Sequence, residues 1–285
     1  MFFYPFVAAL LTAGDIIYEK YVFTWSKLKN KQNVFVPVMF MFAFIFLAIF
    51  VVIFPDMAEI KADAYKPVFL LLMLLVVAVA SLRNMLYYYS FQREGLGEIE
   101  PFMSFVPLLT ILIAGIVYPQ ETNIQIFALA IIAALALVLS HIKKRHLFFD
   151  KALWPIFIAI ILEAVENNLV RELLRFYSPV SMYMIRSFFI AIMLMIFIRP
   201  QFKKANNKEI INLAIISLLW VFVMVFTYYA YQTVGVVYTS LIMMLSPMLI
   251  VFGSRLVLKD KKLTKRNFIT LIIIIACVIA AQFVK

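Results

Sequence analysis

The strongest constraint on this chain is the stretch Ile210–Ser254, in which 45 consecutive residues carry no charged side chain. A helix crosses the hydrocarbon core of a bilayer with about 20 apolar residues. The stretch is therefore too long for one crossing, and Gly235 is its natural break. The whole chain is similarly apolar, with 66% hydrophobic and 14% charged residues and a mean hydropathy of +1.01. Soluble domains are about 25% charged, so a soluble enzyme, a secreted domain and a disordered chain are excluded.

Ten apolar runs divide the chain of 285 residues. Each run is continuous rather than alternating, which indicates helices and excludes a barrel of transmembrane strands. The sequence therefore predicts an all-α integral membrane protein with ten transmembrane helices, the first of which is a retained helix and not a signal peptide. The runs are Phe2–Val22, Val34–Phe54, Pro67–Phe91, Pro101–Tyr118, Ile124–Ser140, Ala152–Leu174, Pro179–Ile198, Ile210–Tyr231, Val236–Leu258 and Asn267–Val284.

Few residues are available for metal or nucleophilic chemistry. Cys277 is the only cysteine, and His141 and His146 are the only histidines, so neither a disulfide nor a zinc site is expected. No glycine-rich phosphate loop follows a strand, which argues against ATP as the energy source. The sequence predicts no cofactor, no metal site and no enzymatic activity.

An internal repeat relates the two halves of the chain at one constant offset. Leu86–Gln120 and Phe226–Asp260 align without a gap and share eight identical positions, including a Tyr-Tyr-x-x-Gln-x-x-Gly pattern. Five helices in each half place the halves in opposite orientations. We therefore expect two inverted five-helix repeats, 1–142 and 152–285, joined by a basic loop at 143–151.

This repeat resembles the EamA-type members of the drug/metabolite transporter superfamily. One part of the likeness is the aromatic end of the third run, with the short glycine loop and the proline-containing fourth run that follow it. Further parts are Tyr118-Pro119-Gln120-Glu121 before the fifth run and Ser178-Pro179, which leads to Arg186 in the seventh run. In the second half, the basic stretch Leu258–Thr264 stands at the position that the acid Glu121 has in the first half. The resemblance implies a ten-helix fold around a central cavity walled mainly by runs one, three, four, six, eight and nine.

Charged side chains inside the runs are candidates for function, because charge at bilayer depth is costly. Asp15 and Glu19 share one face of the first run, and Glu163 and Glu166 lie in the sixth, the equivalent run of the second half. No histidine lies inside a run, so a carboxylate is the expected proton carrier, with Glu163 the first choice and Asp15 the second. The alternative interpretation is a set of structural ion pairs. The candidates for proton coupling or charge pairing are Asp15, Glu19, Glu163, Glu166 and Arg186.

A second group of side chains is expected to contact substrate. Tyrosines gather at the ends of runs three and eight, where they can form an interfacial aromatic belt or the wall of a cavity that binds a flat or cationic group. The predicted substrate-binding residues are Arg83, Asn84, Tyr87, Tyr88, Asn167, Tyr228 and Tyr231. Pro107 and Pro247 each leave a backbone carbonyl without its helical donor, and are interpreted as hinges or as fixed kinks.

From these features we predict a secondary active transporter of the cell membrane that moves a small organic metabolite by alternating access. The family resemblance alone favours export, and a proton gradient is the energy source that we consider for transport. The alternatives are a flippase for a lipid-linked or amphipathic substrate, a passive channel and a non-transporting membrane component. The expected partners are the substrate and membrane lipids, with no nucleic acid, in a monomer or a dimer.

Loops after the odd-numbered runs carry 18 Lys and Arg residues, against five on the opposite side. The positive-inside rule places these loops in the cytoplasm and both termini outside, opposite to the orientation in which the family is usually drawn. Cysteines introduced at Lys144 and Lys262, in a Cys277→Ser background, should therefore resist an impermeant thiol reagent added to intact cells. Labelling of both positions in intact cells would instead establish the family's usual orientation.

Overall fold

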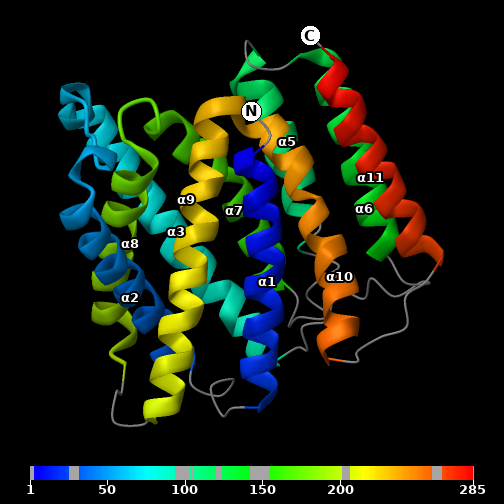
Figure 1. The fold of residues 1–285 in the computed structure, drawn as a ribbon. Helices are drawn as coiled ribbons and strands as arrows, with labels where there is room; N and C mark the ends of the chain where they lie inside the picture. The colour runs from blue at the N-terminus through cyan, green and yellow to red at the C-terminus, as the bar shows by residue number, and fades with distance from the viewer. Residues whose placement is uncertain are drawn as a thin grey trace.

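The computed structural model of the chain describes residues 3–25, 32–93, 103, 105–119, 123–141, 154–200, 206–258 and 265–284. Its regular elements in these ranges are helices, joined in places by short 3-10 turns (Figure 1), which confirms the all-helical fold. The helices are α1 (Phe3–Trp25), α2 (Gln32–Ile53), α3 (Pro67–Arg93), α5 (Phe105–Val117), α6 (Ile124–His141), α7 (Trp154–Leu173), α8 (Pro179–Ile198), α9 (Asn207–Met243), α10 (Leu245–Leu258) and α11 (Lys265–Phe283).

Five helical segments of the described chain are long and apolar enough to cross a bilayer: α2, α3, α8, α11 and the α9–α10 segment. The apolar helices α5 and α6 are shorter. The remaining two, α1 and α7, have 23 and 20 residues and carry three and four charged side chains. These are Asp15, Glu19 and Lys20 in α1, and Glu163, Glu166, Arg171 and Glu172 in α7. Such a chain is a multi-pass integral membrane protein whose most charged long helices need protein neighbours.

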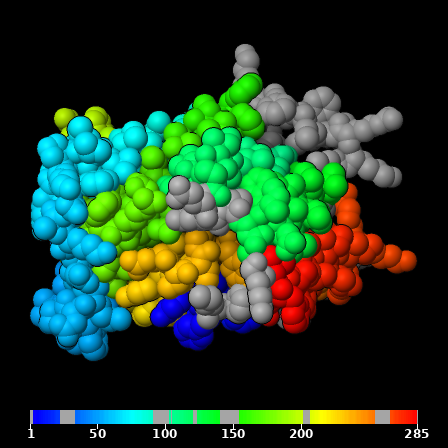
Figure 2. Space-filling model, turned by 90° about the horizontal axis from the view of Figure 1, so that it is seen from above, coloured from blue at the N-terminus to red at the C-terminus, as the bar shows by residue number. Residues whose placement is uncertain are grey.

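Helices from the two halves of the chain interleave and do not form separate bodies. The helix α1 packs against α9 and α10, α2 against α8, α3 against α7, and α6 against α11. Both views place α2 at one end of the molecule and α11 at the other (Figures 1 and 2). The interior therefore lies between helices of different halves. The linker expected at 143–151 lies outside the described residues.

Helix starts follow the spacing of the sequence repeat. The helix α3 begins at Pro67 and its counterpart α9 at Asn207, while α5 begins at Phe105 and its counterpart α10 at Leu245. Both pairs of starts are separated by the offset that aligns the two halves in sequence. Inside α9, Gly235 has φ 79° and ψ 171°, which breaks the helix at the predicted position. The charge-free stretch thus forms two segments instead of one over-long crossing.

At the end of the bundle where both termini lie, hereafter the terminal end, the connection between α2 and α3 is hydrogen-bonded to the connection between α7 and α8. The amide of Lys61 donates to the carbonyl of Phe176 at 2.9 Å, and the amide of Ser178 donates to that of Glu59 at 2.9 Å. The Ser178 hydroxyl oxygen accepts from the Ser181 amide at 3.2 Å, so it caps α8. Helix ends that precede the basic loops, those of α1, α3, α6, α8 and α10, lie at the opposite end from the termini (Figure 1).

Gly235 should be intolerant of a side chain, because its φ and ψ fall in a region that glycine alone readily adopts. We expect Gly235→Ala to lower the free energy of unfolding by about 1–3 kcal/mol. Gly14→Ala is the matched control, since a Cβ there meets no atom within 4 Å and alanine favours helix by up to about 1 kcal/mol. Thermal unfolding in detergent measures both, and equal midpoints would contradict the strain assigned to Gly235.

Candidate functional site: a charged cavity between the halves

A cavity of about 260 Å³ lies between α1, α3, α5, α7, α9 and α10, and α2 contributes Met39 to its wall. Its wall gathers side chains from distant parts of the sequence, from Thr12 in α1 to Ile250 in α10. Most of the predicted site residues line it. They are Asp15, Glu19, Arg83, Asn84, Tyr87, Tyr88, Pro107, Glu163, Glu166, Asn167, Tyr231 and Pro247.

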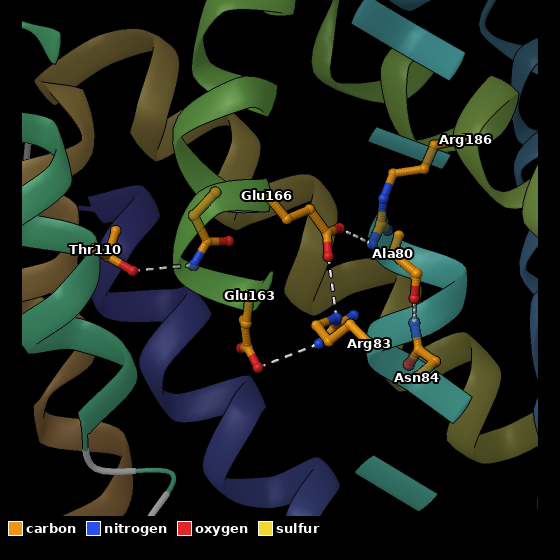
Figure 3. Close-up of polar contacts among 8 residues, drawn as sticks. Ala80, Arg83, Asn84, Thr110, Glu163, Glu166 and Arg186 are labelled. Atoms are coloured by element: carbon orange, nitrogen blue, oxygen red, sulfur yellow. Dashed lines mark hydrogen bonds and ion pairs between the residues drawn. The ribbon is translucent and has the colours of Figure 1, made fainter. Parts of the chain in front are cut away.

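An ion-pair network forms one side of the cavity (Figure 3). The Arg83 guanidinium lies between two carboxylates, with Nη1 3.3 Å from Glu163 Oε2 and Nε 3.0 Å from Glu166 Oε2. The second oxygen of Glu166 accepts a hydrogen bond from Arg186 Nη2. Two arginines and two glutamates thus neutralise one another, which is the condition for keeping such groups out of water.

Arg186 and Tyr228 stand behind the cavity wall and do not line it. Arg186 is fully buried, with its guanidinium carbon 5.6 Å from the ring centre of Tyr183. Tyr228 packs edge-on against Tyr183 and stacks on Tyr231, with ring centres 5.9 and 6.4 Å apart. Both residues therefore position groups of the wall: Arg186 holds Glu166, and Tyr228 supports Tyr231.

The acids of α1 have a different environment from those of α7. Asp15 is 1% exposed, and its Oδ1 has no hydrogen-bond partner within the described part of the chain. Glu19, one turn further along, accepts a hydrogen bond from the Tyr88 hydroxyl at 3.3 Å. Among the described residues, no basic side chain pairs with either carboxylate. The first helix of each half, α1 and α7, therefore brings two acids to the cavity. Within the described ranges, only the acids of α7 are paired with arginines.

Side-chain amides hold α5 against α7 beside the cavity. Asn167 Nδ2 donates to the Thr110 hydroxyl at 3.4 Å, and Asn168 Nδ2 donates to the Thr110 carbonyl at 3.2 Å. The Tyr118 hydroxyl donates to the Asn168 carbonyl at 2.7 Å. Asn84 turns back to its own helix and donates to the Ala80 carbonyl at 2.7 Å. Asn84 and Asn167 thus have structural bonds as well as a place in the wall.

Each of the two predicted hinge prolines is the third residue of a described helix, Pro107 in α5 and Pro247 in α10. Proline is tolerated in a first turn, because the amide it lacks has no helical acceptor there. The prolines stand at corresponding points of the repeat, next to the break between α9 and α10 at Met244 in the second half. Their role as hinges stays a prediction.

Several residues of the wall were missed by sequence reasoning, among them Thr110, Lys20 and Trp220. Trp220 precedes Tyr231 by about three helical turns, so the two share a face of α9. That spacing is a signal the sequence contains. Thr110 offers no such signal, because its place in the wall depends on how α5 meets α7.

A second cavity of about 610 Å³ lies at the terminal end of the bundle, around the Gly235 break. Its polar lining includes Asn123, Arg171, Gln232 and Gln282. Acidic side chains are absent from the part of its wall that the described residues form. The smaller, central cavity is the better candidate site, because it gathers the buried charges.

The fold and the site define a multi-pass membrane protein with a charged central cavity. Residues 151–281 match the family model of the EamA-like transporter family. The match covers most of the second half of the chain and confirms the resemblance seen in the sequence. A solved crystal structure of a protein superimposes with a TM-score of 0.70 at 12% identity, over 98% of this chain and 96% of that one, which shows a shared fold. Comparison with the curated proteins finds no match.

Glu166 should matter more for stability than Glu163, because it compensates two arginines. We expect Glu166→Gln to cost about 3–5 kcal/mol, the range for breaking a buried pair. Glu163→Gln should cost less, because it leaves Arg83 paired with Glu166. Thermal unfolding in detergent makes the comparison.

The matched control is Glu172→Gln, also in α7, which removes a partly exposed pair with Arg175 at 3.2 Å. Such a pair contributes about 0–1 kcal/mol. Equal unfolding midpoints for Glu166→Gln and Glu172→Gln would show that the buried network does not stabilise the fold.

Proposed function

We propose that this protein is a secondary active transporter that carries a small organic metabolite across the cell membrane by alternating access. The observation that carries the proposal is the central cavity, whose charged wall is built by helices of both halves. Sites at the interface of two repeats are typical of secondary transporters. The EamA-like match of residues 151–281 supports the same class.

The proposed architecture is a pair of inverted five-helix repeats making ten crossings. Its support is the common spacing of helix starts in the two halves and the opposite directions in which α3 and α9 run (Figure 1). Two such repeats can exchange conformations, so that the cavity opens to one side and then to the other. One chain builds the described wall, so the proposed unit of transport is one chain, alone or within a dimer. The proposed direction is export, from the family resemblance.

Proton coupling is proposed at Asp15 rather than at Glu163. An ion pair with Arg83 at 3.3 Å must break before Glu163 takes up a proton. Asp15 is buried, lines the cavity and lacks a basic partner among the described residues. A buried carboxylate without a counterion is the group expected to bind and release a proton. The ionisable side chains that share the cavity with Asp15 are Glu19, Lys20, Arg83, Tyr87, Tyr88, Glu163, Glu166 and Tyr231.

The purified protein in liposomes tests the proposal. Panels of radiolabelled amino acids, amines, nucleosides and sugars should reveal a solute with saturable flux and counterflow, which a channel does not show. A pH gradient should accelerate flux of that solute by the native protein and by Glu163→Gln, but not by Asp15→Asn. Gradient-driven flux through Asp15→Asn at the native rate would remove Asp15 from the coupling step. Non-saturating flux of every solute would contradict the carrier itself.

A further inference from the structure

The central cavity has an excess of negative charge. Four carboxylates line it, from Asp15, Glu19, Glu163 and Glu166, and the basic residues of the wall are Lys20 and Arg83. Counting Arg186, which bonds to Glu166 from behind the wall, leaves four acids against three bases. Because the α7 acids are the ones paired with arginine, the excess lies on α1.

The same network makes the cavity unsuited to an anionic substrate. Two carboxylates already flank Arg83, and Arg186 is fully buried behind the wall. A carboxylate on a ligand would have to displace Glu163 or Glu166 to reach Arg83. A cation, in contrast, meets carboxylates on α1 that have no basic partner among the described residues.

Asp15 is the specific anchor for a cation. It is only 1% exposed, it lines the cavity, and its Oδ1 has no hydrogen-bond donor in the described residues. Two carboxylates one turn apart, at Asp15 and Glu19, repel each other unless a cation or a proton lies between them. An ammonium group supplies both the charge and the hydrogen-bond donors that Asp15 lacks.

The rest of the wall fits an apolar body. Trp220, Met224 and Ile216 of α9 line the cavity together with Met39 of α2. Aromatic faces attract cations and methionine adapts to irregular apolar shapes. A volume of about 260 Å³ is slightly below the usual range of ligand pockets, which is about 300–1,000 Å³. The cavity thus fits one small molecule with a charged head and a compact apolar part.

We infer that the substrate class is a small organic cation with an apolar body, whose ammonium group binds Asp15 and Glu19 and whose body packs against Trp220. This inference rests on the proposed transport function and names its substrate class. The groups of the described wall that recognise it come from α1 and α9.

Binding of three probes of similar shape tests the inference: 2-phenylethylamine, 2-phenylethanol and phenylacetate, which are cationic, neutral and anionic at pH 7. Calorimetry on the purified protein in detergent should show the amine binding at least about tenfold more tightly than the alcohol, and the carboxylate most weakly. Asp15→Asn should weaken amine binding by about tenfold or more, because truncating one partner of a buried charge pair has effects of that size. Asp56→Asn, the same change at an exposed acid, should bind the amine like the native protein.

Glu19→Gln provides a second variant if Asp15→Asn does not fold, and thermal unfolding checks both. Equal affinity for amine and alcohol, or amine binding unchanged in a folded variant of each acid, overturns the cation site. Flux in liposomes separates this outcome from failure of the proposed function. A protein that transports solutes without charge preference overturns the cation site alone, and a protein that binds the amine without any flux overturns only the carrier.

Discussion

Compensation of buried charge is the constraint on which this structure depends. An ion without a partner in a low-dielectric bilayer is costly, so each charged group inside the bundle needs a counterion, a proton or a polar ligand. Glu166 satisfies this need for Arg83 and Arg186 at once, and in doing so it ties α7 to α3 and α8. The most charged long helices, α1 and α7, accordingly pack against helices of the opposite half.

Because the two halves interleave, their charged helices line one central cavity, and it is there that buried charge must be compensated. Because α1 meets α9 and α10 while α7 meets α3 and α5, the polar faces of the charged helices point to a shared interior. Amide contacts such as Asn168 to the Thr110 carbonyl fix α5 at its edge. The cavity is therefore a consequence of how helices of the two halves pack against each other.

The two acid pairs show how one chemistry can have two roles. Glu163 and Glu166 are bound to arginines and belong to the frame of the cavity, whereas Asp15 has no basic partner among the described residues. The first pair favours a single arrangement of α3, α7 and α8. The second pair, Asp15 and Glu19, has charge that the described residues leave uncompensated and that a bound proton or cation can neutralise. A transport cycle requires such a group, which gains a partner in one state and loses it in another.

The sequence by itself determined that the chain is a helical membrane protein, because apolar runs of this length have no other stable environment than a bilayer. It also located the Gly235 break, the spacing of the repeat and most of the cavity residues, since charge inside an apolar run is rare enough to be conspicuous. Only the tertiary structure decided which charges meet. Arg83 and Glu163 belong to different halves of the sequence, yet their side chains lie 3.3 Å apart in space, and no helical periodicity reports a contact between different helices. For the same reason the sequence favoured Glu163 over Asp15, and only the packing of α3 against α7 showed which acid has an arginine beside it.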